Sequence, residues 1–302
     1  MIVRKIALLT GSSGDPVDSQ DVDYAIHCVE EMDEQEYASY LEARDTLLRF
    51  QADSRSWAMV HLNFFDFERF LDRMFTSWIA QDPRFDVDKA AWDVDRRILN
   101  LASSYAAHFE HLKARYKTRY GRQSKRSLDL ENRLSSNDFP YRFVLRYRHH
   151  VVHVGQPVSR LTLNSRSIDE NPMKLEFEML VTISKSDLAQ GRSSELKYMR
   201  SWPDQISLRP VLRDAMEWGS TLNKDELRKD IGDLEKAALT IMPLSEYWEG
   251  QVGTPCIVES EFDETDKWRQ ISPYQIAAIP VKPARVVLKL KKEIDQGDQG
   301  SQ

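Results

Sequence analysis

Residues 141–158, YRFVLRYRHHVVHVGQPV, hold three of the seven histidines and three arginines. The six basic side chains are those of Arg142, Arg146, Arg148, His149, His150 and His153. A histidine that titrates near neutral pH can move a proton, and an arginine beside it binds phosphate through its planar guanidinium. Arginine and histidine without a carboxylate cluster suit RNA cleavage without a metal, because the RNA's own 2′-hydroxyl can attack the phosphate.

The spacing decides which of these side chains can act together, because the apolar pattern and the Gly-x-Pro that follows predict a helix that ends there. His149 and His153 are four residues apart and share a face of that helix. Arg146, His150 and His153 are related by steps of four and three, so they share a second face. Arg148 and His153 are about 140° apart around the axis. Those two would meet only if the helix distorts or a second subunit brings them together.

Three interpretations of the cluster compete. In the structural one, the histidines fill a helix face and the arginines pair with acids. In the metal-binding one, His149-x-x-x-His153 has acceptable zinc spacing. However, the glutamate of an H-E-x-x-H motif is absent, and the flanking arginines repel a cation. We therefore expect no metal and no cofactor. The third interpretation is acid–base chemistry on a phosphodiester, with arginine binding the phosphate and histidine transferring the proton.

The residues from Arg148 to His153, R-H-H-V-V-H, fit the R-x4-6-H motif of the HEPN superfamily, in which a polar residue follows the arginine. The stretch also resembles a group of bacterial HEPN-like proteins with an F-x-Y-R-F entry, an Arg-Asn-x-x-x-His core and a Gly-x-Pro exit. The corresponding residues here are FPYRF at 139–143, Arg148, His149, His153, Gly155 and Pro157. The resemblance covers roughly residues 60–160, which include the helical pattern before the motif.

The resemblance implies a helical bundle, usually a homodimer, in which the motifs of two subunits face each other across a cleft. It implies metal-independent ribonuclease activity, commonly in toxin–antitoxin, abortive-infection or other defence systems. Arg148 would then bind or polarise the scissile phosphate, and His153 would act as general acid or base. His149 would occupy the polar position, where these relatives usually have Asn. Arg146 fits the longer R-x6-H spacing, so the choice between the two arginines stays open.

A basic segment surrounds the motif. Residues 111–153 contain eleven lysines and arginines and three acids, a net charge of +8, whereas the whole chain carries −6. A basic stripe on an acidic body is typical of a site for a polyanion, although a solvated helix end has the same composition. The side chains expected to contact RNA are those of Arg142, Lys113, Lys117, Arg119 and His150. Tyr116 and Tyr120 lie on the apolar stripe, which favours core packing over base stacking.

The periodicity predicts a mainly α (α+β) fold, a HEPN-like helical bundle with an inserted β-hairpin and short C-terminal strands. Besides the motif helix at 139–154, helices are expected at 57–78 after Ser56 as cap, at 88–120, and at 209–242 with a break near Asn223. Alternation predicts hairpin strands at 159–168 and 173–183. The other segments are a helix within 24–52, a loop at 11–23, a polar connector at 121–138, strands formed by CIVES, YQIAAIPV and ARVVLKL, and a disordered tail.

Three regions follow from these elements. Residues 1–155 would hold the helical core with the motif, residues 156–250 the hairpin and the helices that complete the bundle, and residues 251–302 a small extension with strands. Two cysteines do not suggest a disulfide framework, and no stretch approaches the roughly 18 apolar residues that span a bilayer. We therefore expect a cytoplasmic protein without a membrane partner.

The leading hypothesis is a dimeric HEPN-type ribonuclease, a toxin or defence protein, whose partners are RNA or a nucleotide and an antitoxin. The alternative is a non-catalytic HEPN-like module that binds nucleotides, RNA or a protein. A third hypothesis is a scaffold in which the arginines and histidines form only a buried polar network.

Overall fold

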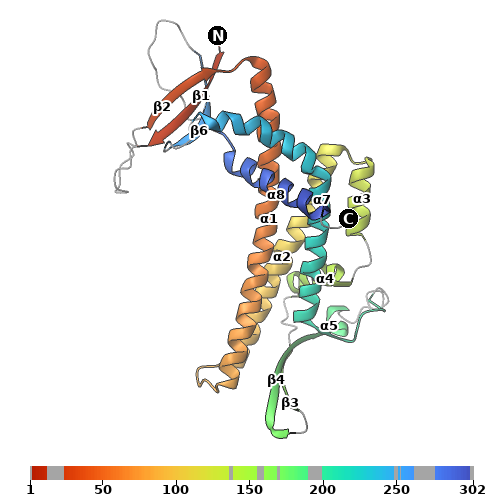
Figure 1. The fold of residues 1–302 in the computed structure, drawn as a ribbon. Coiled ribbons are helices and arrows are strands. Elements are labelled where there is room, and N and C mark those ends of the chain that lie inside the picture. Colours follow the sequence, from red (N-terminus) through yellow and green to blue (C-terminus); the bar gives the residue numbers. More distant parts are fainter. Residues whose placement is uncertain are drawn as a thin grey trace. The chain divides into compact units, whose positions relative to one another are not determined.

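The computed structural model describes residues 2–11, 24–135, 139–154, 160–168, 171–189, 199–247, 251, 253–261 and 276–299 (Figure 1). The chain forms two compact units. The terminal unit comprises Met1–Ala52 and Asp225–Gln302, and the central unit comprises Asp53–Lys224. This division differs from the expected boundaries at 155 and 250. Those boundaries followed changes of period along the chain, whereas the terminal unit joins the first and last segments.

Helices make up most of the structure, and the fold class is mainly α with small antiparallel sheets, as the periodicity predicts. The helices are α1 (Glu34–Ile79), α2 (Val87–Tyr120), α3 (Lys125–Leu134), α4 (Phe139–Val154), α5 (Lys185–Ala189), α7 (Leu208–Glu246) and α8 (Val281–Gln299). The central unit also holds a three-stranded sheet in the order β3-β4-β5, formed by Arg160–Ile168, Asn171–Ser184 and Gln205–Ser207. The hairpin predicted after the motif helix is therefore present.

The terminal unit is built on a four-stranded antiparallel sheet in the order β2-β1-β6-β7. Its strands are β1 (Ile2–Gly11), β2 (Tyr24–Glu31), β6 (Thr254–Glu261) and β7 (Ile276–Ala278). One face packs against helical segments through Ile6, Tyr40, Ile241, Ile257 and Val287, all of them buried. The neighbouring strand residues Ala7, Cys256 and Val258 form a second buried cluster. Alternate residues of one strand therefore enter different clusters, as the period of two requires.

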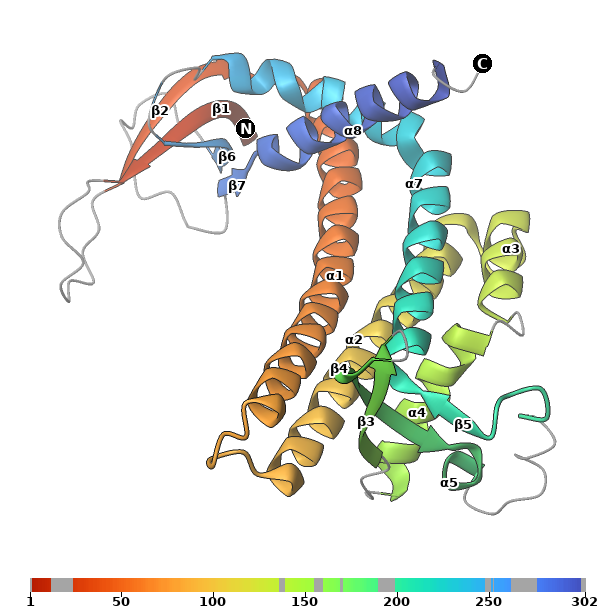
Figure 2. The same cartoon turned by 60° about the horizontal axis from the view of Figure 1, so that its bottom comes forward.

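Helix α2 shows how local sequence sets the central unit. Asp86 caps its first turn by accepting hydrogen bonds from the backbone N–H groups of Asp88 and Lys89. Gly121 ends it with φ of 87°, a left-handed conformation that glycine adopts at little cost. Figure 2 shows α2 running beside α1 and joined to it by a short turn. Both ends of α2 agree with the expected helix at 88–120.

The core of the central unit is an aromatic cluster to which four helices contribute. The ring of Phe109 in α2 lies 5.8 Å from Trp57 in α1, 5.8 Å from Tyr141 in α4 and 5.7 Å from Trp218 in α7. Offset and edge-on ring pairs at such distances contribute about 0.5–1.5 kcal/mol each beyond the burial of area. Tyr105 adds a hydrogen bond of 2.9 Å from its hydroxyl to the carbonyl oxygen of Ala215. These contacts hold α4 against α2 and α7.

Several expected elements differ at the N-terminal end. No element was expected over residues 2–11, which form β1 because Ile6 and Leu8 are buried and alternate with Ala7 in the opposite cluster. The first part of the segment 24–52, where a helix was expected, forms β2 instead. Helix α1 then begins after Asp33, whose side chain and that of Glu36 accept each other's backbone N–H group in a capping box. The loop expected at 11–23 lies outside the described residues apart from Gly11, the last residue of β1.

The helices are also longer than expected. Ser56 is not a cap, because α1 is continuous from Glu34 to Ile79. Likewise α7 continues through Asn223, whose side chain bonds to its own helix at the Gly219 carbonyl. The polar connector contains α3, which Ser124 caps. The ARVVLKL strand was wrong, because this segment lies in α8: Val286 is half exposed while its neighbours at helical spacing, Ala284 and Val287, are buried. The tail expected to be disordered is helical as far as Gln299.

Among the described residues, no helix combines the length and apolar character needed to cross a membrane.

Two glycines of α7 give a matched test of the aromatic packing around Phe109. A methyl group on Gly219 would lie 2.6 Å from Trp57 Cη2 and 3.3 Å from Phe109 Cζ, whereas one on Gly232 would meet nothing within 4 Å. Gly219→Ala should lower the free energy of unfolding by about 1–3 kcal/mol because the ring must move. Gly232→Ala should raise it by about 1 kcal/mol, since alanine favours helix. Urea unfolding followed by circular dichroism measures both, and equal effects of the same sign would contradict the close approach.

Candidate functional site

The basic cluster lies on α4, which buries one side in the core of the central unit. Tyr141, Phe143, Val144 and Tyr147 are all at most 3% exposed. The hydroxyl of Tyr147 donates a hydrogen bond of 3.1 Å to the carboxylate of Asp95, a buried residue of α2. These contacts fix the rotation of α4 about its axis, so they also determine which side chains remain at the surface.

Four basic side chains follow one line along the other side of α4: Arg142, Arg146, His149 and His153, at steps of four, three and four residues. We call these four residues the α4 stripe. Steps of this kind place side chains above one another on a helix. His149 and His153 are exposed, and the two arginines are half-buried at the edge of the packed face. The stripe thus brings two of the arginines and two of the histidines singled out in the sequence to one surface.

The side chains of the α4 stripe are held in place. The guanidinium of Arg142 donates a hydrogen bond of 2.6 Å to the carbonyl oxygen of Ser135, just after α3. The guanidinium of Arg146 donates one of 3.2 Å to the carbonyl oxygen of Leu188 in α5. The rings of His149 and His153 lie 4.4 Å apart between centroids, tilted by 51°. The stripe therefore presents two anchored cations and a contacting pair of imidazoles.

Arg148 is exposed and stands away from the stripe. On a regular helix it lies about 140° around the axis from His153, and the exposed side chain of Val152 lies between them. Within one copy of the chain the structure does not bring Arg148 and His153 together. Arg146 lies two turns before His153 and about 20° away from it around the axis. The geometry of a single copy therefore favours the longer R-x6-H spacing over R-x4-H.

His150, expected to contact RNA, is buried instead and is only 2% exposed. Neither ring nitrogen has a hydrogen-bond partner among the described residues. Burial lowers the pKa of this imidazole, and the nearby charges of Arg146 and His149 lower it further, while Asp187 opposes them. The charged form of the ring is therefore disfavoured, and the buried side chain contributes to packing beneath the stripe.

The basic segment of α2 is largely neutralised by neighbouring acids. Lys113 pairs with Glu110 at 2.9 Å, and Lys117 pairs with Glu131 of α3 at 2.5 Å. The guanidinium of Arg119 lies 5.0 Å above the ring of Tyr120. Exposed pairs of this kind contribute little to stability, but they reduce the charge available to a polyanion. The Lys113, Lys117 and Arg119 contacts with RNA remain predictions.

The tyrosines in this segment belong to the packing, as their place on the apolar stripe predicts. Tyr116 is buried, and its ring lies 5.3 Å from that of Tyr120. Arg126 of α3 covers both rings, at 5.6 Å from Tyr116 and 4.4 Å from Tyr120. A base could not stack on Tyr116 without displacing this arrangement.

His108, a histidine of α2, was not among the candidate residues predicted from the sequence. It is fully buried, and its ring bonds to Ser56 at 3.1 Å through Nδ1 and to Asn223 at 2.9 Å through Nε2. Since Asn223 Oδ1 can only accept, Nε2 carries the proton and Nδ1 accepts from the serine hydroxyl. Burial lowers the pKa of His108. His108 lies on the apolar stripe of α2, between Tyr105 and Leu112, and this position alone would have predicted a buried, structural side chain.

No family model matches the chain, and neither the curated proteins nor the solved structures compared with it give a match. The resemblance to the HEPN superfamily therefore remains a prediction from the sequence. A function assigned to α4 has to follow from the geometry of the stripe.

His150 gives the site a predicted pH dependence. Its folded pKa is lowered, so between that value and the ordinary value of about 6.5 the unfolded chain binds more protons than the folded one. The contribution of His150 to the free energy of unfolding is therefore fully present above about pH 6.5, and it is lost as the pH falls toward the folded pKa. Replacing the ring by an apolar side chain in His150→Leu should make the free energy of unfolding less dependent on pH in this window.

The measurement is urea unfolding at a series of pH values from about 7 to about 5. His111→Ala removes an exposed ring of α2 and serves as the control. An unchanged pH dependence in His150→Leu would mean that His150 is not a neutral buried ring.

Proposed function

We propose that the central unit is a metal-independent ribonuclease whose working groups lie on the α4 stripe. The observation that carries this proposal is the alignment of Arg146, His149 and His153 on one side of α4, with the two imidazoles in contact. Phosphodiester cleavage needs a cation for the phosphoryl oxygens and a group that moves a proton. The stripe offers both within two helical turns.

In the proposed reaction, His153 takes the proton from the 2′-hydroxyl of the RNA, and the 2′-oxygen forms a bond to phosphorus. The bond from phosphorus to the 5′-oxygen breaks, and that oxygen receives a proton, leaving a cyclic phosphate and a free 5′-hydroxyl. Arg146 binds the non-bridging oxygens, where negative charge develops. His149, whose ring is in contact with that of His153, would give the proton to the 5′-oxygen. The His149–His153 pair can therefore supply a base and an acid.

The binding-only alternative has its own supporting observation. Arg142 and Arg146 each donate to a backbone carbonyl, so both guanidinium groups take part in positioning α3 and α5. A stripe used in this way could hold an RNA or nucleotide phosphate without cleaving it. The RNA cleavage assay described next distinguishes the two functions, because a binding-only protein would leave the RNA intact.

The first test is cleavage of a mixed RNA pool in the presence of excess EDTA. The wild-type protein should retain its activity, because no step of the proposed reaction uses a metal. His153→Ala should lower the cleavage rate by about 10²–10⁴-fold, the usual loss for a positioned acid–base group. His111→Ala, an exposed histidine of α2 in the same unit, should stay near wild type. RNA binding without cleavage would support the alternative, and loss of cleavage in EDTA would contradict the proposal.

The second test decides which arginine works. Lysine keeps the charge but lacks the planar fork, so Arg146→Lys should lower the cleavage rate about tenfold or more, and Arg148→Lys should have little effect. Melting temperatures control for the contact between Arg146 and Leu188. The reverse ranking would favour the R-x4-H assignment that the HEPN resemblance implies.

Mixing variants extends this test to a homodimer, which the resemblance also implies. If Arg148 of one copy served His153 of another, copies carrying Arg148→Ala and His153→Ala would regain about a quarter of the wild-type activity when mixed, because mixed dimers hold one intact site. If Arg146 and His153 of the same copy act together, mixing Arg146→Ala with His153→Ala restores nothing. The toxin or defence role and the antitoxin partner are part of the proposal and would be tested by growth arrest on expression.

A further inference from the structure

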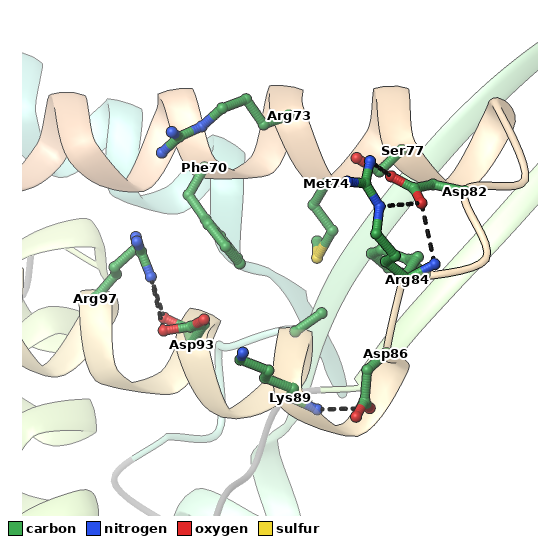
Figure 3. A pocket seen from close by; sticks show the side chains of 12 residues that line it. Phe70, Arg73, Met74, Ser77, Asp82, Arg84, Asp86, Lys89, Asp93 and Arg97 are labelled. Carbon is green, nitrogen blue, oxygen red and sulfur yellow. Dashed lines mark hydrogen bonds and ion pairs between the residues drawn. The ribbon is translucent and has the colours of Figure 1, made fainter.

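A cavity of about 360 Å³ lies within the central unit where α1 ends and α2 begins (Figure 3). Its volume is at the lower end of the range for small-molecule sites, about 300–1,000 Å³. Figure 3 shows Arg73 and Lys89 on opposite walls, from α1 and α2, with Phe70 and Met74 between them. The space is suited to one small ligand.

Four cations and three carboxylates line the cavity. Arg84 is paired with Asp82 at 3.0 Å, and Arg97 is paired with Asp93 at 3.1 Å and with Asp66, which lies outside the lining, at 3.1 Å. Asp86 faces the backbone N–H groups at the start of α2, as described above.

The two remaining cations are those of Arg73 and Lys89, both exposed. Arg73 donates only to the carbonyl oxygen of Arg69, and neither side chain has a carboxylate partner among the described residues. Their charge is therefore available to a ligand.

The remaining lining is apolar and partly aromatic. It consists of Phe70, Met74, Phe85 and Ala90. The guanidinium of Arg97 already covers one face of Phe70 at 4.0 Å, and Phe85 is stacked on Trp78 at 5.8 Å. These contacts hold the walls in place, so a ligand would meet a preformed surface with a flat apolar part.

The cavity is separate from the α4 stripe. Among the α2 residues that line it, Lys89, Asp93 and Arg97 are four residues apart and lie near one another on the helix surface. Asp95, which bonds to Tyr147 of α4, lies about 160° around the α2 axis from Asp93 and about 120° from Lys89. The cavity thus opens on the α1 side of α2, away from α4, and its ligand does not depend on the proposed ribonuclease.

We propose that this cavity binds a small aromatic carboxylic acid. The carboxylate would pair with the guanidinium of Arg73, whose fork offers two parallel N–H donors, or with the ammonium of Lys89 on the opposite wall. The aromatic part would pack against Phe70, Met74 and Phe85. One carboxylate would give a partner to cations that have no carboxylate beside them, and a purely polar anion would leave the apolar lining without a partner.

The test is isothermal titration calorimetry of the full chain with indole-3-acetate, with indole-3-acetamide as a neutral probe of the same shape and acetate as the anion alone. Indole-3-acetate should bind saturably with a Kd below ~5 mM, and this Kd should be at least about tenfold lower than that of either control. Absence of saturable binding up to that concentration, or equal binding of the amide or of acetate, overturns the proposal.

Variants then locate the site. The double variant Arg73→Gln/Lys89→Gln should weaken indole-3-acetate binding by about tenfold or more. Arg55→Gln/Lys125→Gln removes the same charge from exposed positions of the same unit and should change it by less than about twofold. Ser77→Phe, which keeps every charge but occupies the cavity, should also abolish binding. Unchanged binding in the first variant or in Ser77→Phe would place the ligand elsewhere, and melting temperatures confirm that each variant is folded.

Discussion

The central unit depends on the packing of aromatic rings around Phe109. This one side chain of α2 contacts rings from α1, α4 and α7, and it is itself fully buried. Large flat side chains fit together in few ways, so each helix has little freedom to rotate about its own axis. Gly219 of α7 is part of the same constraint, since only a residue without a side chain lets the helix approach Trp57 so closely.

Buried polar contacts then select the register of helices that apolar packing alone would leave less defined. His108 bonds to Ser56 and Asn223, and Tyr147 bonds to Asp95. A one-residue shift of α4 or α7 would leave these groups without partners in the core, at a cost of about 1–3 kcal/mol each. The exposure of the α4 stripe is a consequence, because the rotation that buries Tyr147 turns Arg146, His149 and His153 outward or to the edge.

The sequence predicts those parts of the fold in which local and tertiary preferences agree. Helix α2 has an amphipathic stripe, the Asp86 cap and Gly121, so its bounds follow from local chemistry. The helical state of α8 does not follow from local chemistry. Val286 and Val287 favour a strand locally, and only their packing selects the helix. The terminal unit joins residues far apart in the sequence, as the pairing of Lys5 with Val258 shows. No local pattern encodes such a pairing, so this unit could not be predicted.

The same distinction applies to the sites. The arginines and histidines of α4 are visible in the sequence, but which of them share a surface depends on how the core rotates the helix. His150 differs from His149 by one position, and that step takes it from the surface to the interior. The cavity residues were not recognised because Arg73 and Lys89 lie sixteen residues apart on two helices, and only the tight turn brings them to opposite walls. In both proposed sites one arginine is held by the scaffold: Arg146 bonds to the carbonyl oxygen of Leu188, and Arg73 bonds to its own helix. Since side chains that are already ordered lose less entropy on binding, an anion would gain more from these arginines than from the paired lysines of α2.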